Sequence, residues 1–188
     1  MRIYSLAELC HDFHQKNLQR GWWKKDENGV TIQRNIGELI ALKHSELDEC
    51  WFGWKEEVED DHLPQFDMWK VELADTCIRL FDTLGYLEMD QESFNEIERG
   101  ANFAALTGAT IDVALLDLHL CLTHALEHFR KNRQLEGRRS LATCLLALLH
   151  WVEDEFDIYE IIFAKDAYNA VRVDHTLAHR AAAGGKAF

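Results

Sequence analysis

The sequence predicts an all-α fold, and three observations support this class. The chain has 188 residues with one proline and 10 glycines, so few residues would interrupt a helix. Apolar residues recur with a period of 3.6 over several long stretches, which is the pattern of amphipathic helices. Because 47% of the residues are hydrophobic, the chain has enough apolar material for one proper core, and we expect a single domain over residues 1–188.

Helices are expected wherever this period persists. Asn35 can cap the second helix, and Glu38 stands at the capping-box spacing after it. Helix 111–130 is apolar around nearly its whole circumference, so we expect it to be buried, either centrally or between subunits. A basic connection is expected over Lys131–Arg139. The expected helices are Ser5–Arg20, Asn35–Glu57, Asp67–Leu87, Gln91–Arg99, Ile111–Arg130 and Leu141–Phe163.

Composition narrows the possible function classes. The formal net charge of −13 argues against a general nucleic-acid surface, because phosphate backbones require cationic stripes. The five cysteines are odd in number and widely spread, which indicates small buried residues in a reducing compartment and not a disulfide framework. Neither a signal-peptide pattern nor a membrane-spanning apolar run is present. We therefore expect a cytoplasmic protein that does not bind membranes.

Two of the expected helices each carry a pair of carboxylates three residues apart. The first pair is Glu46 and Glu49, and the second is Glu72 and Asp75. At 3.6 residues per turn such a pair lies on one side of its helix, so two antiparallel helices facing each other would bring four carboxylates together. Such a cage of hard oxygens suits Mg²⁺ or Mn²⁺. The alternative interpretation is that both pairs lie on solvated helix faces.

Other polar patterns leave more than one interpretation open. Lys165, Asn169 and Arg172 follow one another at helical spacing, which is typical of a phosphate-binding face or of a surface cation stripe.

We interpret His124 and His128 as surface or packing residues, because no acid completes a zinc motif around them. Glu153, Glu155 and Asp157 are interpreted as the solvated edge of the last apolar helix. No phosphate-binding glycine loop and no triad of nucleophilic catalysis is evident.

The acidic motifs resemble those of a known family. The stretch His44–Glu49, followed by Glu72–Asp75 and then Ile78–Asp82, resembles the signature of the MazG-like, all-α nucleoside triphosphate pyrophosphohydrolases. Further segments resemble the smaller phage and bacterial members at both ends of the chain: Asn17 and Gly21–Trp23 near the start, and Lys165, Tyr168–Asn169, Arg172 and Gly184–Phe188 near the end.

This resemblance implies a fold, a reaction and site residues. The fold would be the helical bundle of the all-α nucleoside triphosphate pyrophosphatase type, with its metal site between two antiparallel acidic helices. The reaction would be metal-dependent hydrolysis of a nucleoside triphosphate between its α- and β-phosphates, with Mg²⁺ or Mn²⁺ as cofactor. Glu46, Glu49, Glu72 and Asp75 would be metal ligands, and either Glu46 or Glu49 would also orient the attacking water. The implied substrate-binding residues are Asn17, Trp22, Trp51, Lys165, Asn169, Arg172 and Lys186.

The family pattern also suggests assembly, location and rival functions. We expect a homodimer or homotetramer in a bacterial or phage-infected cytoplasm, with residues 181–188 forming a C-terminal flap that carries Lys186. Trp54 is expected to be core rather than part of the nucleotide site. The favoured substrates are purine deoxynucleotides such as dATP and dGTP. The alternatives are dUTP, phosphoribosyl-ATP, or no catalysis at all, the chain then being a helical interaction module.

Overall fold

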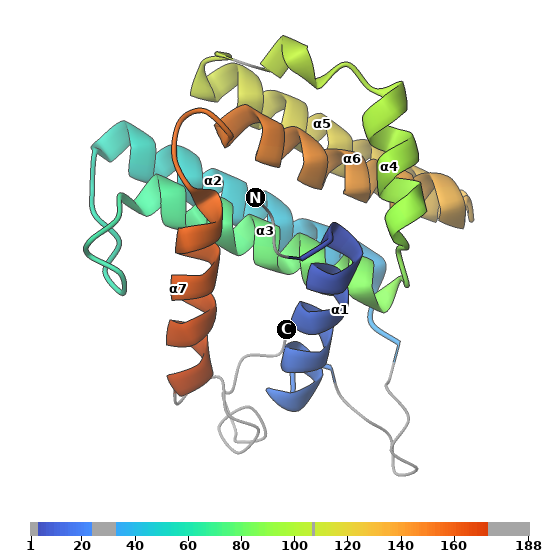
Figure 1. Ribbon diagram of the computed structural model, residues 1–188, viewed down its shortest axis with the longest axis horizontal. Coiled ribbons are helices and arrows are strands. Elements are labelled where there is room, and N and C mark those ends of the chain that lie inside the picture. Colours follow the sequence, from blue (N-terminus) through green and yellow to red (C-terminus); the bar gives the residue numbers. More distant parts are fainter. Residues whose placement is uncertain (1–3, 24–32, 107, 173–188) are drawn as a thin grey trace.

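The computed structural model describes residues 4–23, 33–106 and 108–172. Within these ranges it contains seven α-helices, a short 3-10 helix and no β-strand, which confirms the all-α class (Figure 1). The helices are α1 (Leu6–Gln19), α2 (Ile36–Glu56), α3 (Met68–Tyr86), α4 (Gln91–Gly100), α5 (Ile111–Arg130), α6 (Gln134–Val152) and α7 (Ile158–Val171), and the 3-10 helix η1 (Phe103–Leu106) lies between α4 and α5.

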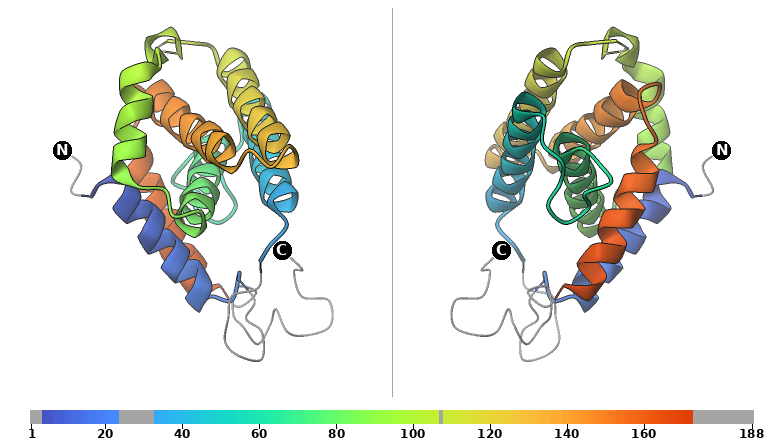
Figure 2. Two further views of the ribbon diagram at one scale, coloured as in Figure 1. Left: turned by 90° about the vertical axis from the view of Figure 1, so that its right-hand side faces the viewer. Right: turned by 90° about the vertical axis from the view of Figure 1, so that its left-hand side faces the viewer.

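The helices α2, α3, α5 and α6 form a four-helix bundle. In this bundle α2 packs against α3 and α5, while α6 closes the ring by packing against α5 and α3 (Figure 2). Two further helices, α1 and α7, pack against α3 on the side away from α5 (Figure 1). Because α3 contacts helices on both sides, nearly all of its surface is buried, and polar residues on it are held inside the molecule.

Side-chain caps fix where several helices begin. Ser5 and Glu8 form a complete capping box at the start of α1, and the Asn35 side chain accepts a hydrogen bond from the Gly37 amide at the start of α2. Asp90 caps α4 in the same way. These caps satisfy amides that have no partner within their helix, so the chain enters each helix at a defined residue.

The single helix expected over residues 141–163 is wrong, because the chain forms two helices there. The Asp157 side chain accepts hydrogen bonds from the amides of Tyr159 and Glu160, and so begins α7 after a short break. Glu153 and Glu155 are solvent-exposed, as expected, but they lie in the connection and not on a helix. The expected connection over residues 131–139 is also too long, since α6 begins at Gln134.

A glycine allows α1 to cross close to α3. Gly85 lies within α3, and a Cβ atom at this position would stand 2.1 Å from the carbonyl oxygen of Cys10 in α1. No side chain fits into that space, so the two backbones approach each other at Gly85. This contact places Asn17 of α1, and Arg20 directly after its end, beside the polar residues of α3.

All five cysteines are free, and four of them are buried, in agreement with their interpretation as small core residues. None of the helices in the described ranges combines the length and apolar character needed to cross a lipid bilayer.

Candidate functional site

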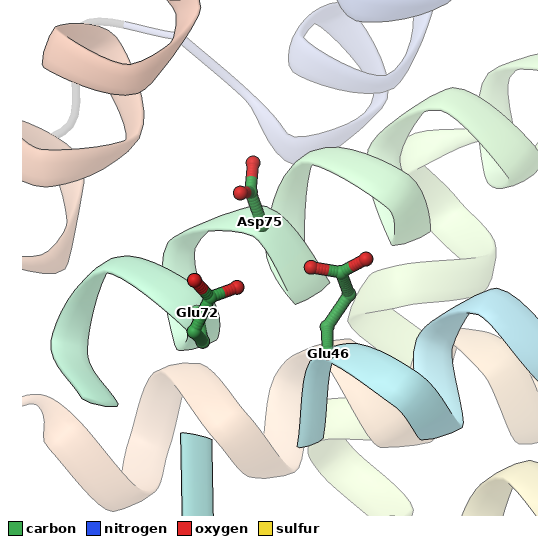
Figure 3. Close-up of side chains that lie close together, drawn as sticks. All are labelled: Glu46, Glu72 and Asp75. Atoms are coloured by element: carbon green, nitrogen blue, oxygen red, sulfur yellow. The ribbon is translucent and has the colours of Figure 1, made fainter. Parts of the chain in front are cut away.

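Three of the four predicted metal ligands converge between α2 and α3. Glu46 points from α2 toward Glu72 and Asp75 on α3 (Figure 3). One carboxylate oxygen from each residue lies within 4.8 Å of those of the other two. Glu46 and Glu72 are each only 6% exposed, whereas Asp75 is half-buried. The structure therefore brings three of the four predicted residues together, from the two helices on which they were expected.

Close packing of the two helices produces this arrangement. Gly53 lies near the end of α2, and a Cβ atom at this position would stand 2.9 Å from the side chain of Met68, the first residue of α3. The start of α3 therefore lies directly against α2. Leu73, Ala74 and Cys77 are fully buried and fix the rotation of α3. Glu72 and Asp75 then lie one turn apart on the remaining polar strip, as the spacing of three residues requires.

The cluster has more negative than positive charge, because its three carboxylates are paired with two cationic side chains, Arg79 and Lys165. Burial, together with the nearby carboxylates of Asp75 and Glu46, raises the pKa of Glu72 to about 9. Burial also raises the pKa of Glu46, although Arg79 opposes this with an ion pair of 2.6 Å. Removing three carboxylates from water without enough cations is costly, and a divalent cation bound by their oxygens would remove that cost. The donor set therefore fits Mg²⁺ or Mn²⁺.

Glu49 does not belong to the three-carboxylate cluster. It lies on α2 one turn after Glu46, and its side chain is exposed. Its charge still acts on Glu46, although this is the smallest of the five influences on the Glu46 pKa. Glu49 is thus placed beside the cluster and not within it.

Lys165 lies inside the site and is paired with one of the carboxylates. Its Nζ atom is 3.0 Å from Asp75 Oδ2 and 3.9 Å from Asp60 Oδ2, and its side chain is 5% exposed. Asp60 is itself buried and accepts hydrogen bonds from the amides of His62 and Leu63. Lys165 therefore contributes one positive charge to the carboxylates from the α7 side.

A pocket of about 100 Å³ adjoins the carboxylate cluster. Asp75 belongs to both, and Arg79, which lines the pocket, is paired with Glu46 of the cluster. Four of the predicted substrate-binding residues line the pocket: Asn17, Trp22, Asn169 and Arg172. Four arginines line it as well, against two carboxylates: Arg20, Arg34, Arg79 and Arg172 against Asp75 and Asp82. The buried Lys43 also lies on its wall. A locally cationic pocket in a chain of net charge −13 is a feature that the composition conceals.

Polar atoms in this pocket have no partner among the described residues. The Arg34 Nη2, Arg79 Nε and Asn169 Oδ1 atoms are buried and make no hydrogen bond in this part of the chain. Two of the three are guanidinium nitrogens, which donate to carboxylate or phosphate oxygens in a planar fork. Buried polar groups are nearly always satisfied, so an unpaired set in one pocket points to a polar, anionic ligand.

The remaining predicted residues lie elsewhere. Trp51 is 38% exposed and stacks on Trp54 with ring centroids 5.3 Å apart, away from the residues that line the pocket. Trp54 is 43% exposed, so the expectation that it belongs to the core is wrong. Lys186 and the flap over residues 181–188 lie outside the described residues.

Sequence reasoning missed several residues of the site. Asp82 accepts hydrogen bonds from His14 Nδ1 at 2.8 Å and from the Trp23 indole, which connects α1 and the chain after it to α3. Arg34 enters the pocket from the residues before α2, and Arg79 enters it from α3. The positions of Arg79 and Asp82, four and seven residues after Asp75, were the available signal, because they continue one helix face.

Comparisons with protein-family models, with curated protein sequences and with solved structures found no match to this chain.

Proposed function

We propose that this protein is a metal-dependent nucleotide pyrophosphohydrolase. Its reaction would convert a nucleoside or deoxynucleoside triphosphate into the monophosphate and pyrophosphate, as the resemblance to the MazG-like family implies. The observation that carries this proposal is the contact between the buried carboxylates and the cationic pocket through Asp75 and Arg79. A metal–triphosphate complex needs both surfaces at once, carboxylates for the ion and guanidinium groups for the phosphates.

In this proposal Glu46, Glu72 and Asp75 hold Mg²⁺ or Mn²⁺. The chemistry that such an ion supplies is the polarisation of phosphate oxygens and of a water molecule. Glu49 is near enough to act electrostatically on Glu46, and one of these two carboxylates orients or deprotonates the attacking water. Arg79 keeps Glu46 in place through their ion pair.

The pocket residues supply substrate binding. Arg34, Arg79 and Arg172 donate to the β- and γ-phosphates, and Lys165 joins them from α7. Asn17 and Asn169 provide amides for the sugar or base edge, and Trp22 provides an aromatic face. Purine deoxynucleotides remain the favoured substrates, with dUTP and phosphoribosyl-ATP as alternatives that use the same chemistry.

The test is product release from a panel of nucleotides. Wild-type protein and the Glu72→Gln variant are incubated with each dNTP, each NTP and phosphoribosyl-ATP, with Mg²⁺, with Mn²⁺ or with EDTA. We expect metal-dependent release of pyrophosphate and monophosphate in equal amounts. Loss of one electrostatic group from an active site typically lowers kcat by roughly 100- to 1,000-fold. Glu72→Gln should therefore lower turnover by roughly 100-fold or more.

Glu56→Gln is the matched control, since Glu56 lies on the same helix as Glu46 but is solvent-exposed and outside the cluster. Its activity should equal that of the wild type. Activity in Glu72→Gln equal to that in Glu56→Gln would exclude the carboxylate site as the catalytic centre. Inactivity of folded wild-type protein on every substrate, together with no binding of Mn²⁺, would favour the helical interaction module instead.

A further inference from the structure

Two histidines on neighbouring helices of the bundle meet outside the proposed active site. His44 on α2 and His119 on α5 have their Nδ1 atoms 2.6 Å apart. The ring planes are nearly parallel, at 6°, and the ring centroids are 4.9 Å apart. Rings stacked face to face cannot bring two nitrogens this close without overlap of their other atoms. The imidazoles therefore lie edge to edge, each directing Nδ1 at the other.

This arrangement allows one proton between the two nitrogens. A neutral imidazole has one nitrogen that donates and one that accepts, so one ring donates through Nδ1 and the other accepts. Replacing that proton by a metal ion would leave two nitrogen lone pairs converging from two different helices. Imidazole nitrogen is a preferred ligand of Zn²⁺, Ni²⁺ and Cu²⁺, whereas Mg²⁺ prefers oxygen.

We propose that His44 and His119 form a second metal site, selective for Zn²⁺, Ni²⁺ or Cu²⁺, that joins α2 to α5. With metal–nitrogen distances of about 2.0–2.1 Å, two nitrogen ligands of a tetrahedral ion stand roughly 3.3 Å apart. The two Nδ1 atoms, now 2.6 Å apart, would therefore have to separate, and both rings would have to turn so that their lone pairs converge on the ion. Both rings are half-buried, which leaves an open side for entry of the ion and for water ligands.

Asp48 is suited to be a third ligand. It lies four residues after His44 on α2, on the same helix face, and its side chain is solvent-exposed. Its negative charge already acts on the His119 ring. Its carboxylate is not part of a close three-donor cluster with the two rings, so a change of its side-chain rotamer would accompany binding.

The histidine site is separate from the carboxylate site in position and in chemistry. His44 and Glu46 are two residues apart on α2, which places their side chains on opposite sides of the helix. Glu46 faces α3, and His44 faces α5. An ion at the histidines would therefore stabilise the α2–α5 contact without entering the pocket, and this inference does not depend on the proposed function.

The experiment measures binding of Zn²⁺ and Ni²⁺ by titration calorimetry, and of Co²⁺ by visible absorption, in a Glu72→Gln background that weakens the carboxylate site. Three further variants are compared: His44→Ala, His119→Ala and the control His124→Ala, which removes an exposed histidine of α5. We expect one ion per chain in the background protein and in His124→Ala. Since loss of even an outer partner of a metal ligand costs roughly 10- to 100-fold in affinity, His44→Ala and His119→Ala should each lose at least that much.

Circular dichroism identifies any variant that fails to fold. Asp48→Asn is less liable to disturb the fold than the histidine variants, because Asp48 is exposed. It should weaken binding of Zn²⁺ without changing the unbound fold. Equal Zn²⁺ affinity in His119→Ala and His124→Ala, or no Zn²⁺ binding by the folded background protein, would overturn the proposal. The Co²⁺ spectrum reports whether nitrogen ligands are present, a signal that a merely structural histidine pair does not give.

Discussion

Lys43 and Lys165 are both buried lysines, but their surroundings act on them in opposite directions. Lys43 is 1% exposed, and its Nζ atom donates to the Leu39 carbonyl at 3.0 Å and to Thr83 Oγ1 at 2.7 Å. Because it is buried, its pKa falls to about 7. Burial also disfavours the charge of Lys165, but the carboxylates of Asp75, Glu72 and Asp60 together outweigh that effect and raise its pKa. Lys165 is therefore a fixed cation, whereas Lys43 changes charge near neutral pH.

The Lys43→Met variant should reveal this difference through the pH dependence of stability. In the unfolded chain the pKa of Lys43 is 10.5, so the side chain stays protonated up to about that pH. In the folded protein its pKa is about 7, so it loses the proton at a much lower pH. Between these values the unfolded state binds more protons, so the free energy of unfolding rises with pH, by at most about 1.4 kcal/mol per pH unit from this group. As the pH rises through this range, the free energy of unfolding of the wild type should increase relative to that of Lys43→Met. Urea unfolding of both proteins at several pH values measures the difference. A difference that does not change with pH would contradict the assignment.

The Lys165→Met variant should bind metal more tightly and triphosphate more weakly. The variant lacks the ammonium group that lies 3.0 Å from Asp75 Oδ2. The net negative charge around the carboxylates is then larger, and it attracts Mn²⁺ more strongly. We expect a gain in Mn²⁺ affinity of roughly tenfold, equivalent to about 1.4 kcal/mol. Calorimetry with Mn²⁺ alone and KM measurements with the triphosphate separate the two effects. Lys131→Met, which removes a surface lysine of another helix end, serves as the control. A fall in Mn²⁺ affinity would show that Lys165 does not compete for the carboxylates.

At the scale of the helices, the α1–α3 crossing at Gly85 is the contact most sensitive to a single methyl group. Gly85→Ala would place a Cβ atom against the Cys10 carbonyl, and the backbone there has no free rotamer with which to avoid it. We expect a loss of roughly 3 kcal/mol in the free energy of unfolding, the upper part of the usual range for overpacking. Gly100→Ala in α4 meets no atom within 4 Å and should cost nothing. Urea denaturation measures the free energy of unfolding of both variants. Equal values for Gly85→Ala and Gly100→Ala would argue against the close crossing of α1 and α3.

Sequence patterns predicted the helices better than the breaks between them. The start of α2 was predictable because Asn35 is a local cap that needs no information from the rest of the fold. The apolar pattern conceals the break before α7, because apolar residues continue across it. Residues 153–157 are not helical, yet a helical period is kept by Trp151, Val152, Phe156 and Ile158. The informative residue was Asp157, whose capping role competes with its interpretation as a solvated acid.

The candidate site was predictable where it depends on one helix and not where it depends on packing between helices. Glu72 and Asp75 share a face because of their spacing alone. Arg34 reaches the pocket only because the chain before α2 passes beside α3, and Asp60 reaches Lys165 only because the loop after α2 folds toward α7. No period in the sequence encodes such tertiary contacts.

For the whole molecule, the outer face of α5 is the strongest indication of assembly. Val113, Leu116 and Leu120 recur at helical spacing and are 45–59% exposed. The expectation that α5 is buried centrally is therefore wrong for this face, and burial between subunits remains a proposal. An exposed apolar strip of this kind is typical of a protein–protein interface.

We expect wild-type protein to elute as a dimer or tetramer, and Leu116→Glu with Leu120→Glu to elute as a monomer with unchanged helix content. Two charges in the centre of an apolar interface would lose their water on assembly, which is costly. Leu135→Glu, an equally exposed leucine at the start of α6, is the control and should leave assembly intact. Light scattering coupled to size exclusion gives the mass of each species. A monomeric wild type would refute an α5 interface.

The central position of α3 has a consequence for how this protein can change over evolutionary time. One helix of 19 residues packs against α1, α2, α6 and α7, and it also carries Glu72, Asp75 and Arg79. A substitution on its apolar side disturbs several neighbours, and one on its polar side alters the chemistry. Surface helices such as α4 have more freedom to drift. Distant relatives should therefore keep α3 recognisable after the rest of the chain has diverged.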